Sequence, residues 1–445
     1  MEQSTHNWSS KIGFILAAAG SAIGLGNIWR LPYLVAQNGG GTFLVIYLFF
    51  CFSIGLSILL AEFAIGRYMG KSLTTKLPSS VKFPNFFSKG SYIFLLVAFS
   101  LLSFYFVVAG WTLTYTFKSA FNLIQYDMNG KNYYEGVFGD ILSSPWQLII
   151  PTLLFVLITA IINYKGVIEG VEKVNLYMLP ALFIMLIIMI VKVLTLDGAI
   201  DGIKYIFSFN TAFITKATIL SALGQAFFSL SLGAGTMIIF GSYVKSNYNL
   251  KQSAISTVLL GSGIGIFSSL MIIPAVFAFH LDINAGPSLT FMTLPTIFAQ
   301  FPFGAFFATI FFLMMSFAAL TSTISILETA IPFASNILKS SRQKAIIIFS
   351  IIVGFLSIIQ SLSFNKLSFI TLFGMNTFDL AGNFVNLGMM ISSIFLCFLI
   401  GFCLPKDIIK NEITNHNTII FKLFNVWYFA IKYVIPLAVI IITLF

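Results

Sequence analysis

The first apolar segment, residues 12–37, constrains the fold most. It is long enough to cross a bilayer, for which about 20 apolar residues suffice. However, Gly20, Gly24 and Gly26 cluster near its middle, and Asn27 and Arg30 follow in the same run. An arginine at mid-membrane costs at least about 2.5–3.5 kcal/mol, so it normally faces protein or a water-filled path. Non-helical backbone at membrane depth is tolerated only where it lines such a cavity. The segment therefore predicts a broken helix built around a ligand.

Composition places the chain among polytopic helical membrane proteins. Of its 445 residues, 58% are hydrophobic and only 9% are charged, whereas soluble proteins carry about 25% charged residues. The mean hydropathy is +0.98. Apolar runs of spanning length begin near residues 12, 42, 91, 148, 174, 217, 254, 304, 344, 376 and 424. These runs predict eleven membrane-spanning helices in an all-α fold.

The net charge of +10 reflects membrane topology and gives no support for nucleic-acid binding. With a cytoplasmic N-terminus, sixteen of the 24 Lys and Arg residues lie in inside loops and six in outside loops, while Arg30 and Lys432 lie within spans. This bias is the positive-inside pattern. We therefore expect a multi-pass protein of the cell inner (plasma) membrane, with the lipid bilayer as its surroundings and no obligatory protein partner.

An enzymatic function has little support in the sequence. The three cysteines and three histidines are dispersed and form no metal-type spacing. No paired carboxylates and no phosphate-cradling glycine loop with a lysine are present.

A second interrupted span is predicted at residues 223–240, whose centre, residues 229–235, reads SLSLGAG. Two glycine-interrupted spans five helices apart are typical of inverted-repeat transporters. The chain is accordingly expected to form one transporter domain, residues 1–445. It would contain a first five-helix repeat at about 11–195, a second at about 215–403, and an additional helix at about 422–445. For either segment alone, close helix packing is an alternative explanation of the glycines.

Hydroxyl side chains accompany both predicted interruptions. Ser21, Ser229 and Ser231 lie in the breaks, and residues 321–323 form a Thr-Ser-Thr stripe in a Phe- and Leu-rich span. Half-helix ends offer carbonyls to a hard cation such as Na⁺ and N–H groups to a carboxylate. In a single span such hydroxyls usually bond to their own helix, which is the expectation for Ser325.

Seven motifs resemble one transporter family. They are Trp8, GSAIGLGNIWRLPY (20–33), NGGGTF (38–43), AEFAIGRYMG (61–70), FYFVVAGW (104–111), GQAFFSLSLGAG (224–235) and ALTSTISILE (319–328). Together they resemble the neurotransmitter:sodium symporter family in its bacterial amino-acid transporter branch, of the eleven-helix type. The resemblance implies sodium-coupled symport by alternating access, with a small neutral amino acid bound near mid-membrane.

The resemblance also implies ligand sets, carried over residue by residue. One sodium site would use Gly20, Ile23, Ala318, Thr321 and Ser322, and a second would use Ala22, Asn27 and Ser229. The substrate would be lined by Ser21, Ala22, Leu25, Gly26, Leu101, Tyr105, Phe228, Ser229, Ser231, Ala234, Ser322 and Ile326. In this scheme Tyr105 donates to the substrate carboxylate, Phe228 forms a lid, and Glu62 accepts from N–H groups of a broken helix.

Position 24 bears on the substrate class. Amine-transporting relatives carry an acid near this point, but here it is Gly24, so the resemblance favours amino acids over biogenic amines. The small Ser21 and Ala234, beside the apolar Leu101 and Ile326, favour a large apolar or aromatic side chain.

The chain departs from the family pattern at its gates and in span 7. The inner gate pair is replaced by Thr5 and Asn336, which predicts a neutral hydrogen-bonded latch. The outer acid is replaced by Gly382, which leaves Asp379 to pair with Arg30.

Span 7 also lacks the expected sodium ligand. Gly261 or Ser262 stands at its position, so one or two sodium ions remain open. The span carries no acid, and Tyr47, Gln225 and Ser229 match family chloride contacts, which makes chloride a candidate second ion.

Four functions compete for this sequence. A secondary active transporter is favoured over a transport-deficient amino-acid sensor or binding protein on the same scaffold. A membrane enzyme and a channel are weaker alternatives, because hydrophobic lids over a broken-helix pair suit occlusion better than a continuous pore.

Overall fold

The computed structural model describes residues 7–70, 81–121, 131–281 and 289–444. Its first half contains α1 (Lys11–Ala22), η1 (Gly26–Arg30), α2 (Leu31–Gln37), α3 (Gly41–Phe50), η2 (Cys51–Gly55), α4 (Leu56–Met69), α5 (Pro84–Gly90), α6 (Tyr92–Ala120), α7 (Lys131–Ser143), α8 (Pro145–Tyr164), η4 (Val167–Glu172), α9 (Lys173–Leu194), α10 (Ala199–Phe207) and η5 (Thr211–Phe213). Its second half contains α11 (Lys216–Ser229), α12 (Thr236–Ser242), α13 (Leu250–Ala278), η6 (Leu289–Thr293), α14 (Leu294–Ala299), α15 (Gly304–Ile337), α16 (Arg342–Leu362), β1 (Thr371–Leu372), β2 (Met375–Asn376), α17 (Thr377–Phe398), η7 (Leu399–Cys403), α18 (Lys406–Thr414), α19 (Phe424–Phe429), η8 (Ala430–Val434) and α20 (Ile435–Leu444).

The prediction of an all-α membrane protein is confirmed. Within the described residues, nine helical segments are long and apolar enough to cross a membrane, and a tenth is the bent pair formed by α1 with η1 and α2. The remaining predicted span corresponds to α11, of 14 residues, and α12, of 7 residues. Each of these is shorter than a bilayer requires, so that span is interrupted.

Polar side chains begin several of these helices. The side chains of Ser10, Thr215, Asn249 and Asn376 each accept a hydrogen bond from a backbone N–H in the first turn. Such N-caps satisfy N–H groups that have no partner inside the helix. They fix where α1, α11, α13 and α17 start.

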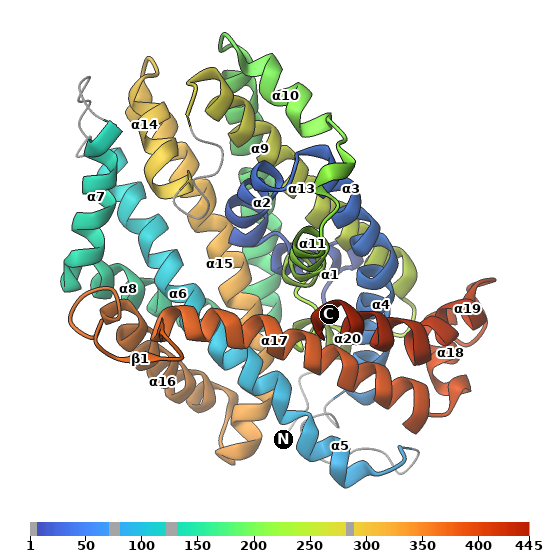
Figure 1. The fold of residues 1–445 in the computed structure, drawn as a ribbon. Helices are drawn as coiled ribbons and strands as arrows, with labels where there is room; N and C mark the ends of the chain where they lie inside the picture. The colour runs from blue at the N-terminus through green and yellow to red at the C-terminus, as the bar shows by residue number, and fades with distance from the viewer. Residues whose placement is uncertain (1–6, 71–80, 122–130, 282–288, 445) are drawn as a thin grey trace.

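Helices α6 and α15 run side by side through the centre of the molecule and pack against each other along much of their length (Figure 1). Helix α1 contacts α9, α13 and α15, whereas α11 contacts α3 and α17. The short helices α7, α10 and α14 lie at the upper end of the bundle, and α5 lies at the lower end (Figure 1). The two interrupted helices are therefore enclosed by long continuous ones.

A small β-hairpin, which we did not predict, precedes α17. Thr371 pairs with Asn376 and Leu372 with Met375, in antiparallel register. The two turn residues, Phe373 and Gly374, have φ values of 53° and 74°. Positive φ at both central residues is typical of a type I′ turn, which matches the twist of a hairpin.

Candidate functional site: a cavity between two interrupted helices

The first interruption lies at Ile23, Gly24 and Leu25. Helix α1 ends at Ala22, η1 begins at Gly26, and the two halves are bent by 51°. The last carbonyls of α1 therefore bond outside the helix: the Ser21 carbonyl accepts from the Ser231 hydroxyl, and the Ala22 carbonyl accepts from the Asn27 side chain. The Leu25 N–H donates to the Tyr105 hydroxyl at 2.7 Å.

Glycine is needed on both sides of this bend. A Cβ at Gly24 would lie 2.4 Å from the Tyr105 hydroxyl oxygen, and one at Gly26 would lie 2.3 Å from the Phe228 ring. Both distances are shorter than real Cβ contacts, so the Tyr105 or Phe228 side chain would have to shift. The clustered glycines thus bring the main chain against α6 and α11.

The second interruption separates α11, which ends at Ser229, from α12, which begins at Thr236. Between them Ser231, Gly233 and Gly235 have φ values of 51°, 72° and 81°. The Gly233 N–H donates to Glu62 Oε1 at 2.7 Å, and the Ser392 hydroxyl donates to the Gly233 carbonyl at 2.5 Å. The role predicted for Glu62 is confirmed: this buried carboxylate binds an N–H group released by a broken helix.

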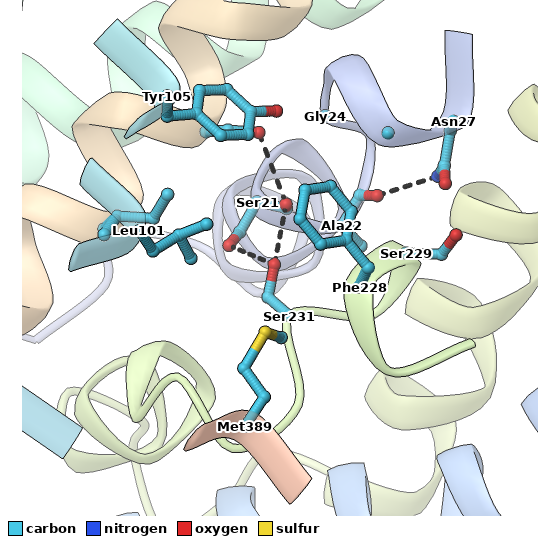
Figure 2. Close-up of a pocket in the computed structure, with 13 residues that line it drawn as sticks. Ser21, Ala22, Gly24, Asn27, Leu101, Tyr105, Phe228, Ser229, Ser231 and Met389 are labelled. Carbon is cyan, nitrogen blue, oxygen red and sulfur yellow. Dashed lines mark hydrogen bonds between the residues drawn. The ribbon is translucent and has the colours of Figure 1, made fainter. Parts of the chain in front are cut away.

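The two interruptions meet at one small cavity. Ten of the twelve residues predicted to contact a substrate line it, and Figure 2 shows the side chains converging on its centre. Its volume is about 20 Å³, room for about one water molecule. The lining consists of Ser21, Ala22, Gly24, Gly26, Asn27, Leu101, Tyr105, Phe228, Ser229, Ser231, Ser322, Ile326 and Met389.

Leu25 and Ala234 are the two predicted residues that lie elsewhere. Leu25 lines a larger vestibule above the cavity, and Ala234 is buried without bordering either space. Met389, on α17, lines the cavity but was missed. No motif marks Met389, because it comes from a helix far along the chain whose backbone abuts the second interruption at Gly233.

The vestibule has a volume of about 580 Å³. Gly26, Tyr105 and Phe228 border both the vestibule and the cavity. The two rings face each other, with centroids 6.5 Å apart and planes at 21°. This aromatic pair separates the two spaces. The role of Phe228 as a lid over a substrate stays a prediction.

The predicted outer gate residues, Arg30 and Asp379, both border the vestibule with Gly382. The Arg30 guanidinium donates to Asn386 Oδ1 at 3.4 Å and lies 5.3 Å from the centroid of the Phe228 ring. Among the described residues, the ion pairs do not include Arg30 with Asp379. Asn386 is therefore the side chain that the Arg30 guanidinium contacts from α17.

The oxygens predicted for the first sodium site lie where α1 faces α15. Gly20, Ile23, Ala318, Thr321 and Ser322 are all buried. The Thr321 hydroxyl donates to the Ala318 carbonyl at 3.1 Å, and the Ser322 hydroxyl reaches the Ser21 carbonyl at 3.5 Å. A donor set made only of carbonyl and hydroxyl oxygens suits a hard cation, so these residues fit sodium.

Two other hydroxyls of α15 point elsewhere. Thr323 pairs with Thr159 of α8, with 3.0 Å between the hydroxyl oxygens. The Ser325 hydroxyl donates to the Thr321 carbonyl at 2.8 Å, so the prediction that it bonds to its own helix is confirmed.

The residues of the second predicted sodium site fit a cation less well. The Asn27 side-chain nitrogen donates to the Ala22 carbonyl at 2.8 Å (Figure 2) and to the Gly261 carbonyl at 2.9 Å. The Gln225 side-chain nitrogen donates to the Ser229 hydroxyl at 2.9 Å. Amide hydrogens thus point at oxygens that a cation would need.

The opposite side of the cavity is closed by the segment before α1. Trp8 is fully buried, and its indole N–H donates to the Phe240 carbonyl at 3.0 Å. Glu172 accepts hydrogen bonds from the backbone N–H and the hydroxyl of both Ser9 and Ser10, at 2.6–3.3 Å. A buried carboxylate therefore holds the start of α1.

This charged contact was not predicted, and it differs from the neutral latch that we expected. Thr5 lies outside the described residues, so the predicted pair with Asn336 is untested. Asn336 lies in the last turn of α15 and is exposed.

An ion pair on α15 and α16 supports the same closure. Glu328 is fully buried and pairs with Arg342, with 2.6 Å between Oε2 and Nη2. The Tyr243 hydroxyl donates to Glu328 at 3.0 Å, and the Tyr243 carbonyl accepts from the Trp8 N–H at 3.1 Å. Desolvation and the Glu328 carboxylate raise the pKa of Tyr243, so its hydroxyl stays a donor. Removing one partner of such a pair leaves a buried charge uncompensated.

The fold and the site define a polytopic helical membrane carrier with a central cavity between broken helices. Comparison with known proteins gives the family. Residues 5–136 and 134–445 match the model of the sodium:neurotransmitter symporter family, and the chain belongs to this family.

Individual relatives agree with the family assignment. The chain is 35% identical to the sodium-dependent transporter YhdH of Bacillus subtilis, over 100% of this chain and 98% of that protein. It is 28% identical to the human sodium- and chloride-dependent taurine transporter, over 90% and 72% of the two chains. The crystal structure of MhsT in complex with L-phenylalanine superposes with a TM-score of 0.87 at 32% identity, covering 99% of both chains. The chain is thus a sodium-dependent symporter and not an enzyme.

Proposed function

We propose that this protein imports a neutral amino acid with a large apolar or aromatic side chain, in symport with sodium and by alternating access. The observation that carries the proposal is the cavity at which both helix interruptions meet. Its lining offers main-chain groups, hydroxyls and apolar side chains, and no lining residue carries a formal charge. Such a site suits a zwitterion, whose two charges cancel.

Each end of a zwitterion has a suitable partner. The substrate carboxylate would take the Tyr105 hydroxyl and the N–H groups at the start of η1, where the helix dipole is positive. The Leu25 N–H, which now donates to Tyr105, supports this assignment. The ammonium would take carbonyls that α1 releases, including that of Ser21. Leu101, Ile326 and Met389 would surround an apolar side chain, and MhsT in its crystal structure binds phenylalanine.

Sodium would occupy the oxygen cluster between α1 and α15. Ser322 belongs to this cluster and also lines the cavity. A cation there would neutralise part of the substrate carboxylate's field and hold the end of α1 against α15. Binding of the two solutes is therefore expected to be mutually favourable, which is the basis of coupled transport.

Alternating access would exchange the open vestibule for an opening beside Trp8. With the N-terminus in the cytoplasm, as the positions of the Lys and Arg residues favour, the vestibule faces outside the cell and the Glu172 contact faces inside. We further propose that the protein resides in the plasma membrane and that residues 11–195 and 215–403 form two inverted repeats.

Uptake of radiolabelled phenylalanine into proteoliposomes tests this function. An inward sodium gradient should drive accumulation, and unlabelled aromatic or large apolar amino acids should compete for it. Accumulation that persists without sodium would contradict the proposal. The alternative, a sensor on the same scaffold, predicts binding without counterflow of labelled substrate.

A chloride requirement is a separate hypothesis. The Tyr47 hydroxyl is buried beside α11 without a hydrogen bond, and Gln225 and Ser229 lie on the facing helix. An anion here would take the Tyr47 and Ser229 hydroxyls, and it would have to draw the Gln225 nitrogen away from Gly26 and Ser229, to which it now donates. Uptake that is unchanged when gluconate replaces chloride would remove this hypothesis.

A further inference from the structure

Two buried amide side chains occupy the place where the family pattern leads us to expect a second sodium ion. Asn27 on η1 and Gln225 on α11 are both fully buried. Gln225 Nε2 donates to the Gly26 carbonyl at 3.0 Å and to the Ser229 hydroxyl at 2.9 Å. Asn27 Nδ2 donates to the carbonyls of Ala22 and Gly261, as described above.

Four oxygens, from α1, η1, α11 and α13, thus already have hydrogen-bond donors. Ala22 and Ser229, two of the three predicted ligands, are among them. The third, Asn27 Oδ1, forms no hydrogen bond. An amide NH₂ group carries partial positive charge, so it can satisfy converging carbonyl oxygens without a bound cation.

The orientation of the Asn27 amide distinguishes a hydrogen-bonded cluster from a cation-binding one. With the nitrogen toward Ala22 and Gly261, each contact is a hydrogen bond. With Oδ1 turned toward them, three oxygens would face one another, and that arrangement is stable only if a cation lies between them. The observed contacts therefore give each of the four converging oxygens a hydrogen-bond donor, and the two amide oxygens, Asn27 Oδ1 and Gln225 Oε1, are left without a partner.

Helix α13 adds no side-chain ligand that would favour a cation. Gly261 has no side chain, and a Cβ there would lie 3.3 Å from the Ala22 Cβ. The neighbouring Ser262 hydroxyl donates to the Val258 carbonyl of its own helix at 2.7 Å. The contribution of α13 to the cluster is the Gly261 carbonyl, which Asn27 already engages.

We propose that the amide groups of Asn27 and Gln225 replace the second sodium ion, so that the carrier couples one sodium, bound between α1 and α15, to each amino acid. This inference rests on the proposed function. If chloride is not co-transported, it implies that one net positive charge crosses the membrane with each zwitterionic substrate.

The coupling ratio tests the inference directly. In proteoliposomes loaded with labelled phenylalanine and sodium, the membrane potential at which net phenylalanine flux vanishes gives the number of sodium ions per substrate. We expect a ratio of one, and a Hill coefficient near one for sodium in uptake. A ratio of two would overturn the inference and leave the proposed symport intact, whereas the lack of any sodium-driven flux would refute the proposed function itself.

Asn27→Asp supplies a second, independent test. It replaces the NH₂ group by a charged oxygen that would face two carbonyls. We expect at least a tenfold loss of phenylalanine affinity, with the Hill coefficient for sodium still near one. Retained affinity, together with tighter sodium binding and a Hill coefficient near two, would show that position 27 ligates a cation. Folding is checked by the sodium-dependent rise in melting temperature that the site between α1 and α15 should still give.

Discussion

Replacing Glu172 by glutamine should open the side of the carrier that the segment before α1 closes, which we propose to be cytoplasmic. The carboxylate is 1% exposed and accepts four hydrogen bonds from Ser9 and Ser10, the residues that precede α1. Glutamine keeps one carbonyl oxygen, but its NH₂ group cannot accept from the donors that now face the second oxygen. Losing one hydrogen bond to a charged group costs about 1.5–3 kcal/mol.

These contacts stabilise the state in which the inner side is closed, so the loss shifts the balance toward the inward-open state. About 2 kcal/mol corresponds to a shift of roughly 30-fold, since 1.4 kcal/mol is a factor of ten. Phenylalanine affinity should fall as the population of the inward-open state rises, because a displaced α1 no longer completes the cavity.

Spin labels at positions 11 and 252 can measure this shift. The native side chains are in contact there, with 2.6 Å between Lys11 Nζ and Gln252 Oε1. The three native cysteines are buried, so labelling can be directed to introduced ones. We expect the Glu172→Gln variant to gain a population at longer distance in detergent and in nanodiscs.

Glu169→Gln is the matched control, because it removes the same charge three residues earlier. Glu169 is exposed, and its ion pair with Lys173 spans 3.5 Å at the surface, where such pairs contribute little. If Glu172→Gln gave the same distance distribution as Glu169→Gln and the native protein, the assigned role of the Glu172 contact would be refuted.

Three further substitutions probe the cavity. Tyr105→Phe removes the hydroxyl that bonds the Leu25 N–H and should weaken phenylalanine binding about tenfold, measured by scintillation proximity; unchanged affinity would place the carboxylate elsewhere. Thr321→Val keeps the shape of the side chain but removes an oxygen from the site between α1 and α15, so half-maximal uptake should require at least tenfold more sodium. Gly233→Ala places a Cβ 2.0 Å from the Met389 carbonyl at a φ of 72°; we expect a melting temperature several degrees lower, and an unchanged one would contradict the close packing.

The interruptions of the spans were predictable because their chemistry is local. Gly24, Asn27 and Arg30 cannot all sit in an ordinary lipid-facing helix, and the SLSLGAG run at 229–235 carries the same conflict. The motif resemblance then named twelve substrate-contacting residues, and ten of them line the cavity.

Other features depend on contacts between distant segments and have no local signature. Met389 reaches the cavity because α17 packs against the second interruption. Glu172 looks like an ordinary polar residue at the start of a span, and only the fold brings Ser9 to it. Likewise, the sequence shows that Asn27 is present but not whether its nitrogen or its oxygen faces Ala22.

The small volume of the central cavity has a consequence for energy conservation in the cell. A carrier that returns empty can dissipate the ion gradient if water and ions follow through its interior. Space for about one water molecule cannot hold a hydrated ion, so the unloaded protein should leak little. The same tightness requires the Tyr105 and Phe228 rings to move apart before a solute enters from the vestibule. Low leakage and slow loading would then have one structural origin.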